Sequence, residues 1–415
     1  MGLIYVLVFF GFFAGALVSP VLSPMFLHPQ DHGVLSAETS PATRAFLLGV
    51  AMAVFRVGEF LGSPILGQLS DKFGRKMVLA AAMGITSVGN LAIAWAISVD
   101  QFWIIVAGQF FLGFVGVLLV LAQAEVANFS VGPEKSRRFG LIYMASSLAY
   151  VFAPVIGGHL ADQQYFPWAS YSVPFYVAAV VCLVCTGLIL WRFPEPGLSN
   201  SETESDGIHL TRGFMEMGEA FKLAPFRALL IVNFFLYLGI DFVFQFNPVY
   251  FVQKWEFTSS HVGWLLSYTS VSMVMTQWLL IKPISKGRTP RTITAVCAVA
   301  LSGLLILEIL PNEWWWLCLI LPCVGAAMAL ATTNMSALLS DTAPPDAQGR
   351  MLGVSHSIRV LGSALLCFCG GILAGLSPQY PILVGAVASI IAAALLCFTV
   401  RTQKPNRKPP SAWPK

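Results

Sequence analysis

The chain has 415 residues, of which 57% are hydrophobic and only 11% are charged, and its mean hydropathy is +0.75. Soluble domains carry about 25% charged residues, so this composition excludes a soluble protein. The formal net charge of +4 is small, and no interleaving of basic and aromatic residues indicates a nucleic-acid partner. The sequence therefore predicts an integral membrane protein in contact with the lipid bilayer.

Apolar stretches of about 20 residues, each long enough for one helix to cross the hydrocarbon core, recur along the chain. The ten-residue alternating pattern typical of a β-barrel is absent from the sequence. We therefore expect an all-α membrane protein with twelve transmembrane helices. The expected spans are 3–25, 45–69, 78–99, 102–127, 139–161, 173–192, 226–252, 262–282, 292–310, 314–340, 350–374 and 381–400.

The 24 Lys and Arg residues are distributed unevenly between the two sides of this layout. Arg44 and Lys254 fall in loops on one side, and Arg56 and Arg359 fall within spans. All others lie in the loops of the opposite side, at the span ends next to those loops, or in the C-terminal tail. Because basic loops stay in the cytoplasm, we expect a multi-pass protein of the cytoplasmic (inner) membrane with both termini inside the cell.

A polar segment rich in Ser, Glu and Gly divides the twelve spans six and six. We therefore predict an N-terminal six-helix bundle (1–193), a cytoplasmic linker (194–222), a C-terminal six-helix bundle (223–400) and a basic cytoplasmic tail (401–415).

The two halves resemble each other in sequence. An offset of 213 residues places Gly157-Gly158 over Gly370-Gly371, and a similar offset of 215 places Ser70 over Ser285. Two parallel six-helix repeats are typical of proteins in which a central site alternates its exposure between the two sides of the membrane.

Two segments carry recognisable spacing. The loop after the second span, from Gly67 to Lys76, contains Asp71, Gly74 and Arg75 between its ends. Glycines allow close backbone approach, an aspartate suits a helix N-terminus, and an arginine can hold a carboxylate with two hydrogen bonds. The fifth span contains Ala153-Pro154-Val155-Ile156-Gly157-Gly158, where Pro154 removes a helical hydrogen bond and Gly157 and Gly158 permit close helix packing.

The loop from Gly67 to Lys76 resembles the loop 2–3 signature of the major facilitator superfamily. The segment from Ala153 to Gly158 is similar to the Gly-Pro-x-x-Gly-Gly signature of its twelve-helix drug:proton antiporter-like branch, to which multidrug and tetracycline efflux proteins belong. The resemblance covers nearly the whole chain. It implies two pseudo-symmetric six-helix bundles, a cytoplasmic gate at Gly67, Asp71, Gly74, Arg75 and Lys76, and a helix-bend motif at Pro154, Gly157 and Gly158.

Three departures from the family pattern limit what the resemblance implies. Gln109 stands where the fourth helix of the family carries an arginine associated with proton coupling, and Ala153 replaces the first glycine of the antiporter signature. Asn128 stands where an acidic gate partner is expected, which leaves Glu125 or Glu134 as the partner of Arg75. Proton coupling must then use other groups.

Charged side chains within spans are costly and are functional candidates by default. Arg56 lies near the middle of the second span with Glu59 three residues later, and Arg359 lies in the eleventh span with His356 three residues earlier. Helices 2 and 11 meet between the two halves in this superfamily, so the resemblance suggests that these two pairs face each other. The alternative is a permanent Arg56–Glu59 pair that neutralises itself.

Asp241 lies in the middle of the seventh span, with Gln245 and Asn247 close by. By resemblance, this helix lines the central cavity. A carboxylate in that position can take up a proton or pair with a cation, and the alternative is a packing aspartate held by hydrogen bonds. We expect Asp241 and Glu59 to carry protons, and Arg56 and Arg359 to bind an anion or to act in gating.

These features predict a secondary active transporter, not an enzyme, that moves a small organic solute by alternating access and is driven by protons. Family resemblance favours drug efflux, whereas the two arginines favour uptake or export of a carboxylate-bearing metabolite or siderophore. A membrane sensor or scaffold that has lost transport is a further alternative. We expect a monomer without a cofactor or a metal site, since no phosphate-binding loop occurs and Cys182 and Cys185 lack further ligands nearby.

Overall fold

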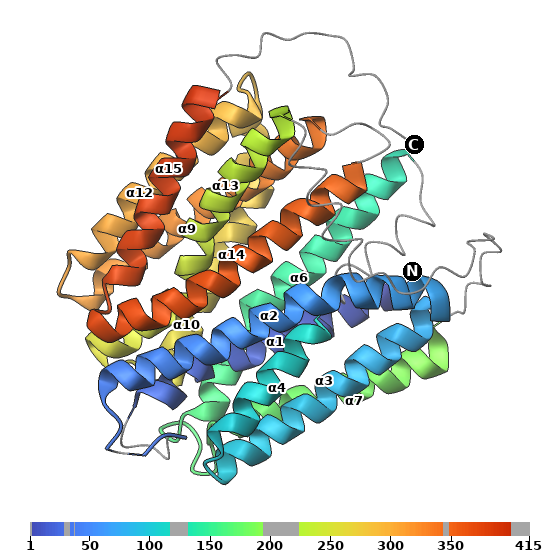
Figure 1. The fold of residues 1–415 in the computed structure, drawn as a ribbon, viewed down its shortest axis with the longest axis vertical. Coiled ribbons are helices and arrows are strands. Elements are labelled where there is room, and N and C mark those ends of the chain that lie inside the picture. The colour runs from blue at the N-terminus through green and yellow to red at the C-terminus, as the bar shows by residue number, and fades with distance from the viewer. Residues whose placement is uncertain are drawn as a thin grey trace. The chain divides into compact units, whose positions relative to one another are not determined.

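The computed structural model describes residues 2–28, 34–36, 38–116, 132–193, 224–342 and 348–399. Within these residues every regular element is a helix (Figure 1). The elements are α1 (Gly2–Leu27), α2 (Pro41–Phe73), α3 (Arg75–Ser98), α4 (Phe102–Phe114), α6 (Gly132–Ala161), α7 (Val173–Arg192), α9 (Ala224–Trp255), α10 (Ser259–Met275), the π-helix η1 (Thr276–Leu280), α11 (Ile281–Ser285), α12 (Pro290–Ile309), the 3₁₀-helix η2 (Trp314–Trp316), α13 (Leu317–Thr342), α14 (Gln348–Leu376) and α15 (Tyr380–Thr399).

Ten of the described helices are long and apolar enough to cross a membrane, and α4 is a shorter apolar helix. Each expected span overlaps a described helix, and the eighth is formed by α10, η1 and α11 in succession. The second part of the fourth span, from residue 117 onward, lies outside the described residues. The predicted all-α fold is thus confirmed.

Two helices begin at a hydroxyl side chain that accepts a hydrogen bond from a backbone amide of the first turn. The Oγ of Ser40 accepts from the amide of Thr43 at 3.2 Å, and the Oγ1 of Thr289 accepts from the amide of Thr292 at 3.3 Å. A proline follows each of these caps and supplies the backbone angle that a first helical turn requires. These caps fix the starts of α2 and α12.

The two short hinges of the repeats turn at glycines with positive φ. Gly74, between α2 and α3, has φ +88°, and Gly287, between α11 and α12, has φ +75°. A Cβ atom disfavours such angles, which explains the glycine at each position. These glycines lie 213 residues apart and each precedes an arginine. The hinges therefore align at the offset of 213 residues and not at the 215 expected from Ser70 and Ser285.

The chain forms two compact units. Unit 1 contains 1–210, 245–271 and 364–380, and unit 2 contains 211–244, 272–363 and 381–415. These units differ from the six-and-six division of the sequence, which remains a prediction.

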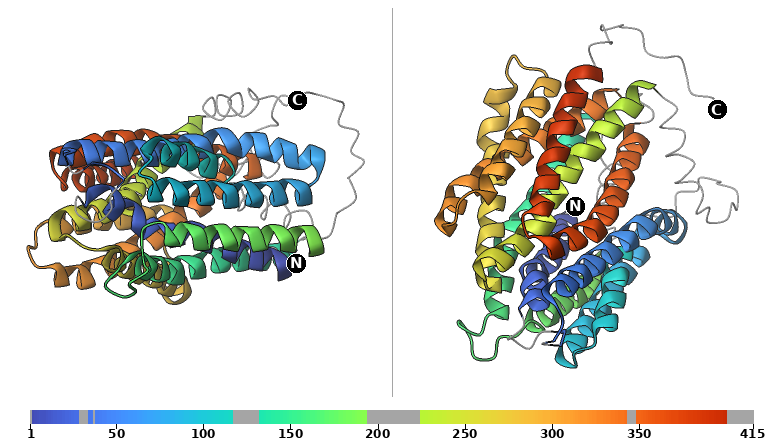
Figure 2. Two further views of the ribbon diagram at one scale, coloured as in Figure 1. Left: turned by 90° about the horizontal axis from the view of Figure 1, so that it is seen from below. Right: turned by 60° about the vertical axis from the view of Figure 1, so that its left-hand side comes forward.

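Unit 1 is built around the first five described helices and α7. In this unit α1 packs against α6 and α7, and α3 packs against α4 and α7 (Figure 2). Side chains from five helices form its core, among them Leu7, Leu66, Met83, Ile142 and Ile189. Burial of apolar side chains in this core holds α2, and with it the charged residues that α2 carries, in place against its neighbours.

In unit 2, α12 packs against α13, and the π-helix η1 also contacts α13. The hydroxyl of Ser272 donates to the carbonyl oxygen of Pro322 at 2.5 Å, which joins α10 to α13. Arg291 at the start of α12 donates to the carbonyl oxygen of Leu396 at 2.6 Å, close to the end of α15. These contacts give unit 2 its own internal order.

Candidate functional site

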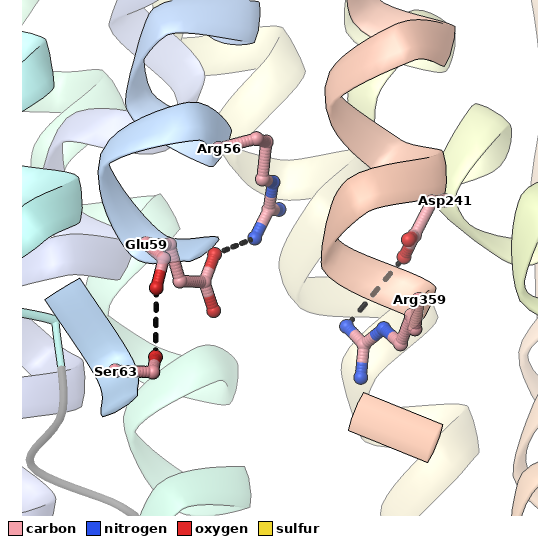
Figure 3. A network of polar contacts seen from close by, with 5 residues as sticks. All are labelled: Arg56, Glu59, Ser63, Asp241 and Arg359. Carbon is pink, nitrogen blue, oxygen red and sulfur yellow. Dashed lines mark hydrogen bonds and ion pairs between the residues drawn. The ribbon is translucent and has the colours of Figure 1, made fainter. Parts of the chain in front are cut away.

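An ion pair lies on α2 within unit 1. The Nη1 of Arg56 donates to the Oε2 of Glu59 at 2.7 Å (Figure 3). The two side chains are 21% and 15% exposed, and their spacing of three residues puts them on one face of the helix. The hydroxyl of Ser63 donates to the backbone carbonyl of Glu59 at 2.7 Å and not to its carboxylate. The structure therefore contains an ion pair between Arg56 and Glu59, and the roles predicted for the two residues remain predictions.

A further residue of the same unit, Gln245 of α9, also contacts Arg56. A guanidinium carries hydrogen-bond donors only, so the amide oxygen of Gln245 faces it. In that orientation the oxygen accepts from Nε at 3.0 Å and from Nη2 at 2.7 Å. The ring of Phe55 lies 5.5 Å from the guanidinium carbon. Arg56 is thereby held from α2 and from α9.

The backbone of α2 near Arg56 lies directly against α4. A Cβ atom at Gly58 or Gly62 would overlap the backbone of Phe110 or Phe114, and one at Gly113 would overlap the backbone of Phe55. Small residues in membrane helices allow this close approach. The helix that carries Arg56 and Glu59 is consequently fixed by backbone contacts that admit no side chain.

A second ion pair lies within unit 2. The Nη2 of Arg359 on α14 lies 3.5 Å from the Oδ1 of Asp241 on α9 (Figure 3). The Asp241 side chain is 4% exposed and the Arg359 side chain 32%. The ring of Tyr237, one turn before Asp241, lies 4.7 Å from the guanidinium carbon of Arg359, a distance that suits a cation–π contact. Asp241 is thus paired with a cation, as the sequence allowed.

Two contacts in unit 2 set the position of α9 relative to α14. The side-chain amide of Asn233 donates to the carbonyl oxygen of Ser355 at 3.5 Å. A Cβ atom at Gly362 would meet the ring of Phe234 at 2.5 Å, so the glycine leaves room for that ring. These contacts flank the Asp241–Arg359 pair and hold the two helices at the distance that the pair requires.

The other predicted site residues are located as follows. His356 lies on α14 and is half-buried, and Asn247 lies on α9 and is 2% exposed. The suggested encounter between Arg56 with Glu59 and His356 with Arg359 remains a prediction, since the two pairs belong to different units.

Polar residues of α10 and α13 bond to their own helices. The hydroxyls of Thr269 and Ser270 each donate to a carbonyl one turn earlier, and so do the hydroxyl of Thr333 and the amide of Asn334. Such bonds satisfy a polar side chain within its own helix. These residues therefore do not need a ligand to satisfy their hydrogen-bonding groups.

The Pro154, Gly157 and Gly158 motif of α6 forms close helix contacts in unit 1. A Cβ atom at Gly157 would overlap the carbonyl of Leu17 on α1, and one at Gly158 would meet the backbone of Ser259 at the start of α10. A Cβ atom at Gly263 of α10 would likewise overlap the carbonyl oxygen of Pro154. The motif thus brings α6 into backbone contact with both α1 and α10.

Asp162 directly follows this motif. Its Oδ2 accepts from the hydroxyl of Ser260 at 2.5 Å, and its Oδ1 accepts from the amide of Gln164 at 3.0 Å. Burial alone would raise the pKa of Asp162, but the hydrogen bonds from Ser260, Thr258 and Gln164, together with the charge of His261, outweigh burial and hold this pKa below its ordinary value. The carboxylate therefore stays ionised at the N-terminus of α10.

The predicted gate lies at the junction of α2 and α3. Gly67 has open space where a Cβ atom would be, and Arg75 and Lys76 are half-buried in the first turn of α3. The side chains of Asp71 and Glu125 lie outside the described residues. The role of these residues as a gate remains a prediction.

Among the described residues, no group of three His, Cys, Asp or Glu side chains is arranged to hold a metal ion. Cys182 and Cys185 are both buried free thiols on α7.

Sequence reasoning missed Tyr237, Asp162 and Ser260. Tyr237 precedes Asp241 by one helical turn, a spacing that could have been noted. Asp162 is an acidic residue that ends an apolar span directly after a glycine motif, which was also a usable signal. No sequence feature indicated Ser260 as its partner. Glu308 near the end of α12, with none of its surface exposed, was also missed as a charged residue within a span.

The sequence model of the Major Facilitator Superfamily matches residues 2–365 and, in a second match, residues 229–415. The chain belongs to the major facilitator superfamily. The tetracycline resistance protein, class C, of Escherichia coli is 25% identical over 317 residues, which cover 76% of each protein. Multidrug resistance protein 2 of Bacillus subtilis (strain 168) is 22% identical over 392 residues, which cover 94% of this chain and 92% of that protein.

A crystal structure of a D-xylose–proton symporter resembles this member of the superfamily with a TM-score of 0.76 at 15% identity. The match covers 95% of this chain and 96% of the symporter. At this identity the likeness supports the fold. Family membership and the described spans together identify a multi-pass membrane transporter, not an enzyme.

Proposed function

We propose that this chain is a proton-coupled secondary transporter that moves a small organic solute by alternating access, with Asp241 as the proton carrier. The observation that carries the proposal is the Asp241–Arg359 pair, in which a carboxylate that is 4% exposed lies 3.5 Å from a guanidinium within two apolar helices. Charges at such positions are costly, and in transporters they mark ion and substrate pathways.

The pair supplies a means of coupling. While Asp241 is ionised, its charge holds Arg359, and the protonated acid no longer attracts the guanidinium by charge. Protonation of Asp241 therefore removes one electrostatic contact of Arg359. One proton thus weakens the electrostatic contact between α9 and α14. Such a change can shift the equilibrium between two arrangements of these helices.

The remaining assignments follow from the sequence pattern. The hinge residues Gly67, Asp71, Gly74, Arg75 and Lys76 act as a cytoplasmic gate, with Glu125 as the partner of Arg75. The excess of basic residues on one side supports cytoplasmic termini and an inner-membrane location.

The names of the relatives, which concern tetracycline and multidrug resistance, support export of drug-like solutes. Arg56 and Arg359 support a second candidate, transport of a carboxylate-bearing metabolite or siderophore, because a guanidinium can bind a carboxylate with two parallel hydrogen bonds.

Flux into proteoliposomes under an imposed pH gradient tests the proposal, with tetracycline and ethidium as drug-like probes and benzoate and citrate as carboxylates. We expect the gradient to accelerate flux of at least one probe, and Asp241→Asn to abolish this acceleration. Asp100→Asn, an exposed change of the same kind between α3 and α4, should leave it intact.

Two results would contradict the proposal. Flux that ignores the gradient in the unmodified chain would exclude proton coupling, and unchanged acceleration in Asp241→Asn would exclude Asp241 as the carrier. Absence of flux for all probes would favour the sensor or scaffold alternative.

A further inference from the structure

A buried carboxylate joins segments of the two predicted halves within unit 1. Asp162, directly after α6, accepts a hydrogen bond of 2.5 Å from Ser260 in the first turn of α10. The two residues are 6% and 1% exposed. With the termini inside the cell, as the basic residues predict, α6 ends and α10 begins on the outer side of the membrane. The bond therefore lies at the outer ends of both helices.

The hydroxyl groups around Asp162 donate towards it. The Oγ1 of Thr258 lies 2.9 Å from the Oγ of Ser260 and 2.8 Å from the Nδ1 of His261. A hydroxyl group has only one hydrogen to donate. Because Thr258 donates this hydrogen to Asp162, the Nδ1 of His261 must be the donor in its contact with Thr258. The direction of these hydrogen bonds is thus set by one acceptor, the Asp162 carboxylate.

The glycine contacts between α6 and α10 are of a different kind, because they carry no charge. At Gly158 and Gly263 the closest atoms of the facing helix belong to the backbone. Such van der Waals contacts are individually weak. The bond from Ser260 to Asp162 has a charged acceptor and a fixed direction, so it contributes more than a neutral contact does. It is therefore suited to control how readily the two helices separate.

We propose that the hydrogen bond between Asp162 and Ser260 is an outer latch, which must break each time α10 leaves α6 to open the solute path to the outer side. This inference rests on the proposed function, because alternating access requires the outer ends of the two halves to separate in every cycle. Asp162 and Ser260 are positioning residues, which act on the helices and not on the solute.

The latch is distinct from the proposed proton carrier. The hydrogen bonds to Asp162 and the charge of His261 hold the pKa of this carboxyl below its ordinary value, although burial opposes them. Asp162 is therefore ionised at neutral pH and does not carry a proton there. Asp241, the proposed carrier, belongs to unit 2. The latch and the coupling step can thus be tested separately.

Ser259 provides the position for a reporter of latch opening. It is 2% exposed, lies against Gly158, and its Oγ has no hydrogen-bond partner among the described residues. Ser259→Cys therefore removes no hydrogen bond, and its thiol becomes accessible to a polar maleimide when α10 leaves α6. Cys185, which is 2% exposed in the core of unit 1, reports general loosening of the unit. Mass spectrometry of the purified full chain in detergent measures the labelling rate of each thiol.

Two substitutions, each combined with Ser259→Cys, weaken the latch. Asp162→Asn and Ser260→Ala should each raise the labelling rate at position 259 about tenfold, as expected for loss of a hydrogen bond to a charged acceptor. Cys185 should stay protected in both variants. Ser260→Ala keeps the charge of Asp162, so it tests the latch even if Asp162→Asn fails to fold.

Matched controls use the same reporter. Thr258→Val removes a hydroxyl that donates to Asp162 and should also raise the labelling rate, whereas Thr258→Ser keeps that hydroxyl and should not. Asp100→Asn and Ser98→Ala are exposed changes at the end of α3 and should leave the rate unchanged.

The inference is wrong if neither Asp162→Asn nor Ser260→Ala accelerates labelling at position 259. It is also wrong if Cys185 becomes reactive to the same degree, since the bond would then hold unit 1 together as a whole. Labelling needs neither a pH gradient nor a solute. Loss of gradient-driven flux together with accelerated labelling would therefore refute the coupling through Asp241 and support the latch.

Discussion

The carboxylate of Asp162 accepts a hydrogen bond of 2.5 Å from the hydroxyl of Ser260, although 98 residues separate the two along the chain. Asp162 directly follows α6 of the first sequence repeat, and Ser260 lies in the first turn of α10 in the second. Both belong to unit 1. Segments that the sequence assigns to different predicted halves are therefore linked within one compact unit by a charged group at a helix N-terminus, where the helix dipole favours an anion.

We expect Asp162→Asn to lower the free energy of unfolding by about 1.5 kcal/mol, because hydrogen bonds to a charged acceptor contribute more than neutral ones. Unfolding of the purified chain in detergent, followed by intrinsic fluorescence, measures the change. Asp341→Asn is a suitable control because Asp341 is exposed at the end of α13. An equal effect of the two substitutions would show that the contact with Ser260 contributes nothing.

The contribution of Asp162 should depend on pH in a defined direction. Its pKa is held below the ordinary value of 3.8, so the unfolded chain takes up the proton first as the pH falls. The stability that Asp162 supplies is fully present above 3.8 and is lost as the pH falls from 3.8 through the folded value. The difference between the unmodified chain and Asp162→Asn should thus stay constant from pH 7 to pH 5 and shrink below about pH 4. A difference that grows on acidification would contradict this assignment.

Close packing of α2 on α14 in unit 1 depends on glycine. A Cβ atom at Gly49 would lie 2.6 Å from the Cα of Gly371 and 2.7 Å from the carbonyl oxygen of Cys367. We expect Gly49→Ala to destabilise the chain by about 1–3 kcal/mol, the usual range for overpacking. Gly187→Ala on α7, where nothing lies within 4 Å of the added atom, should be neutral or slightly stabilising. Equal melting temperatures for the two variants would argue against the close contact.

The Asp241–Arg359 pair should show energetic coupling. Asp241→Asn removes the negative charge 3.5 Å from Arg359, and Arg359→Gln removes the positive charge 3.5 Å from Asp241. Removal of both charges leaves neither group unbalanced. We expect the double variant to be more stable than the sum of the single effects predicts, by a coupling energy of about 1 kcal/mol. Strict additivity in thermal unfolding would mean that the two charges do not stabilise each other.

The hinge glycine between α2 and α3 should resist replacement. Gly74 has φ +88° and ψ 146°, a region that side chains with a Cβ atom rarely adopt. Gly74→Ala should cost about 1–3 kcal/mol through backbone strain. Gly84→Ala, on α3 with only ordinary contacts at 3.9 Å or more, is the matched control. If Gly74→Ala is as stable as this control in thermal unfolding, the positive φ is not required.

Local patterns in the sequence predicted much of the fold. Apolar runs of about 20 residues placed the membrane helices, because a helix must satisfy its own backbone groups within lipid. The spacing of three residues between Arg56 and Glu59 was enough to suggest their ion pair.

Contacts between distant segments could not be predicted in the same way. The partners of Asp241, Asp162 and Arg56 on other helices depend on the rotation and depth of those helices in the bundle, which hydropathy does not specify. Gln245 was selected as a candidate because it lies near Asp241, whereas the contact seen within unit 1 is with Arg56. The repeat offset did not reveal these pairs either, since Arg56 and Asp241 have no charged counterparts at corresponding positions.

The glycine contacts of unit 1 have a consequence for the way in which its helices can separate. At Gly49, Gly157 and Gly158 the closest neighbours are backbone atoms, which have no alternative rotamers and cannot shift singly to fill a gap. A slight separation of two helices that meet at such glycines would open a void along their whole contact. The helices therefore favour either full contact or full separation.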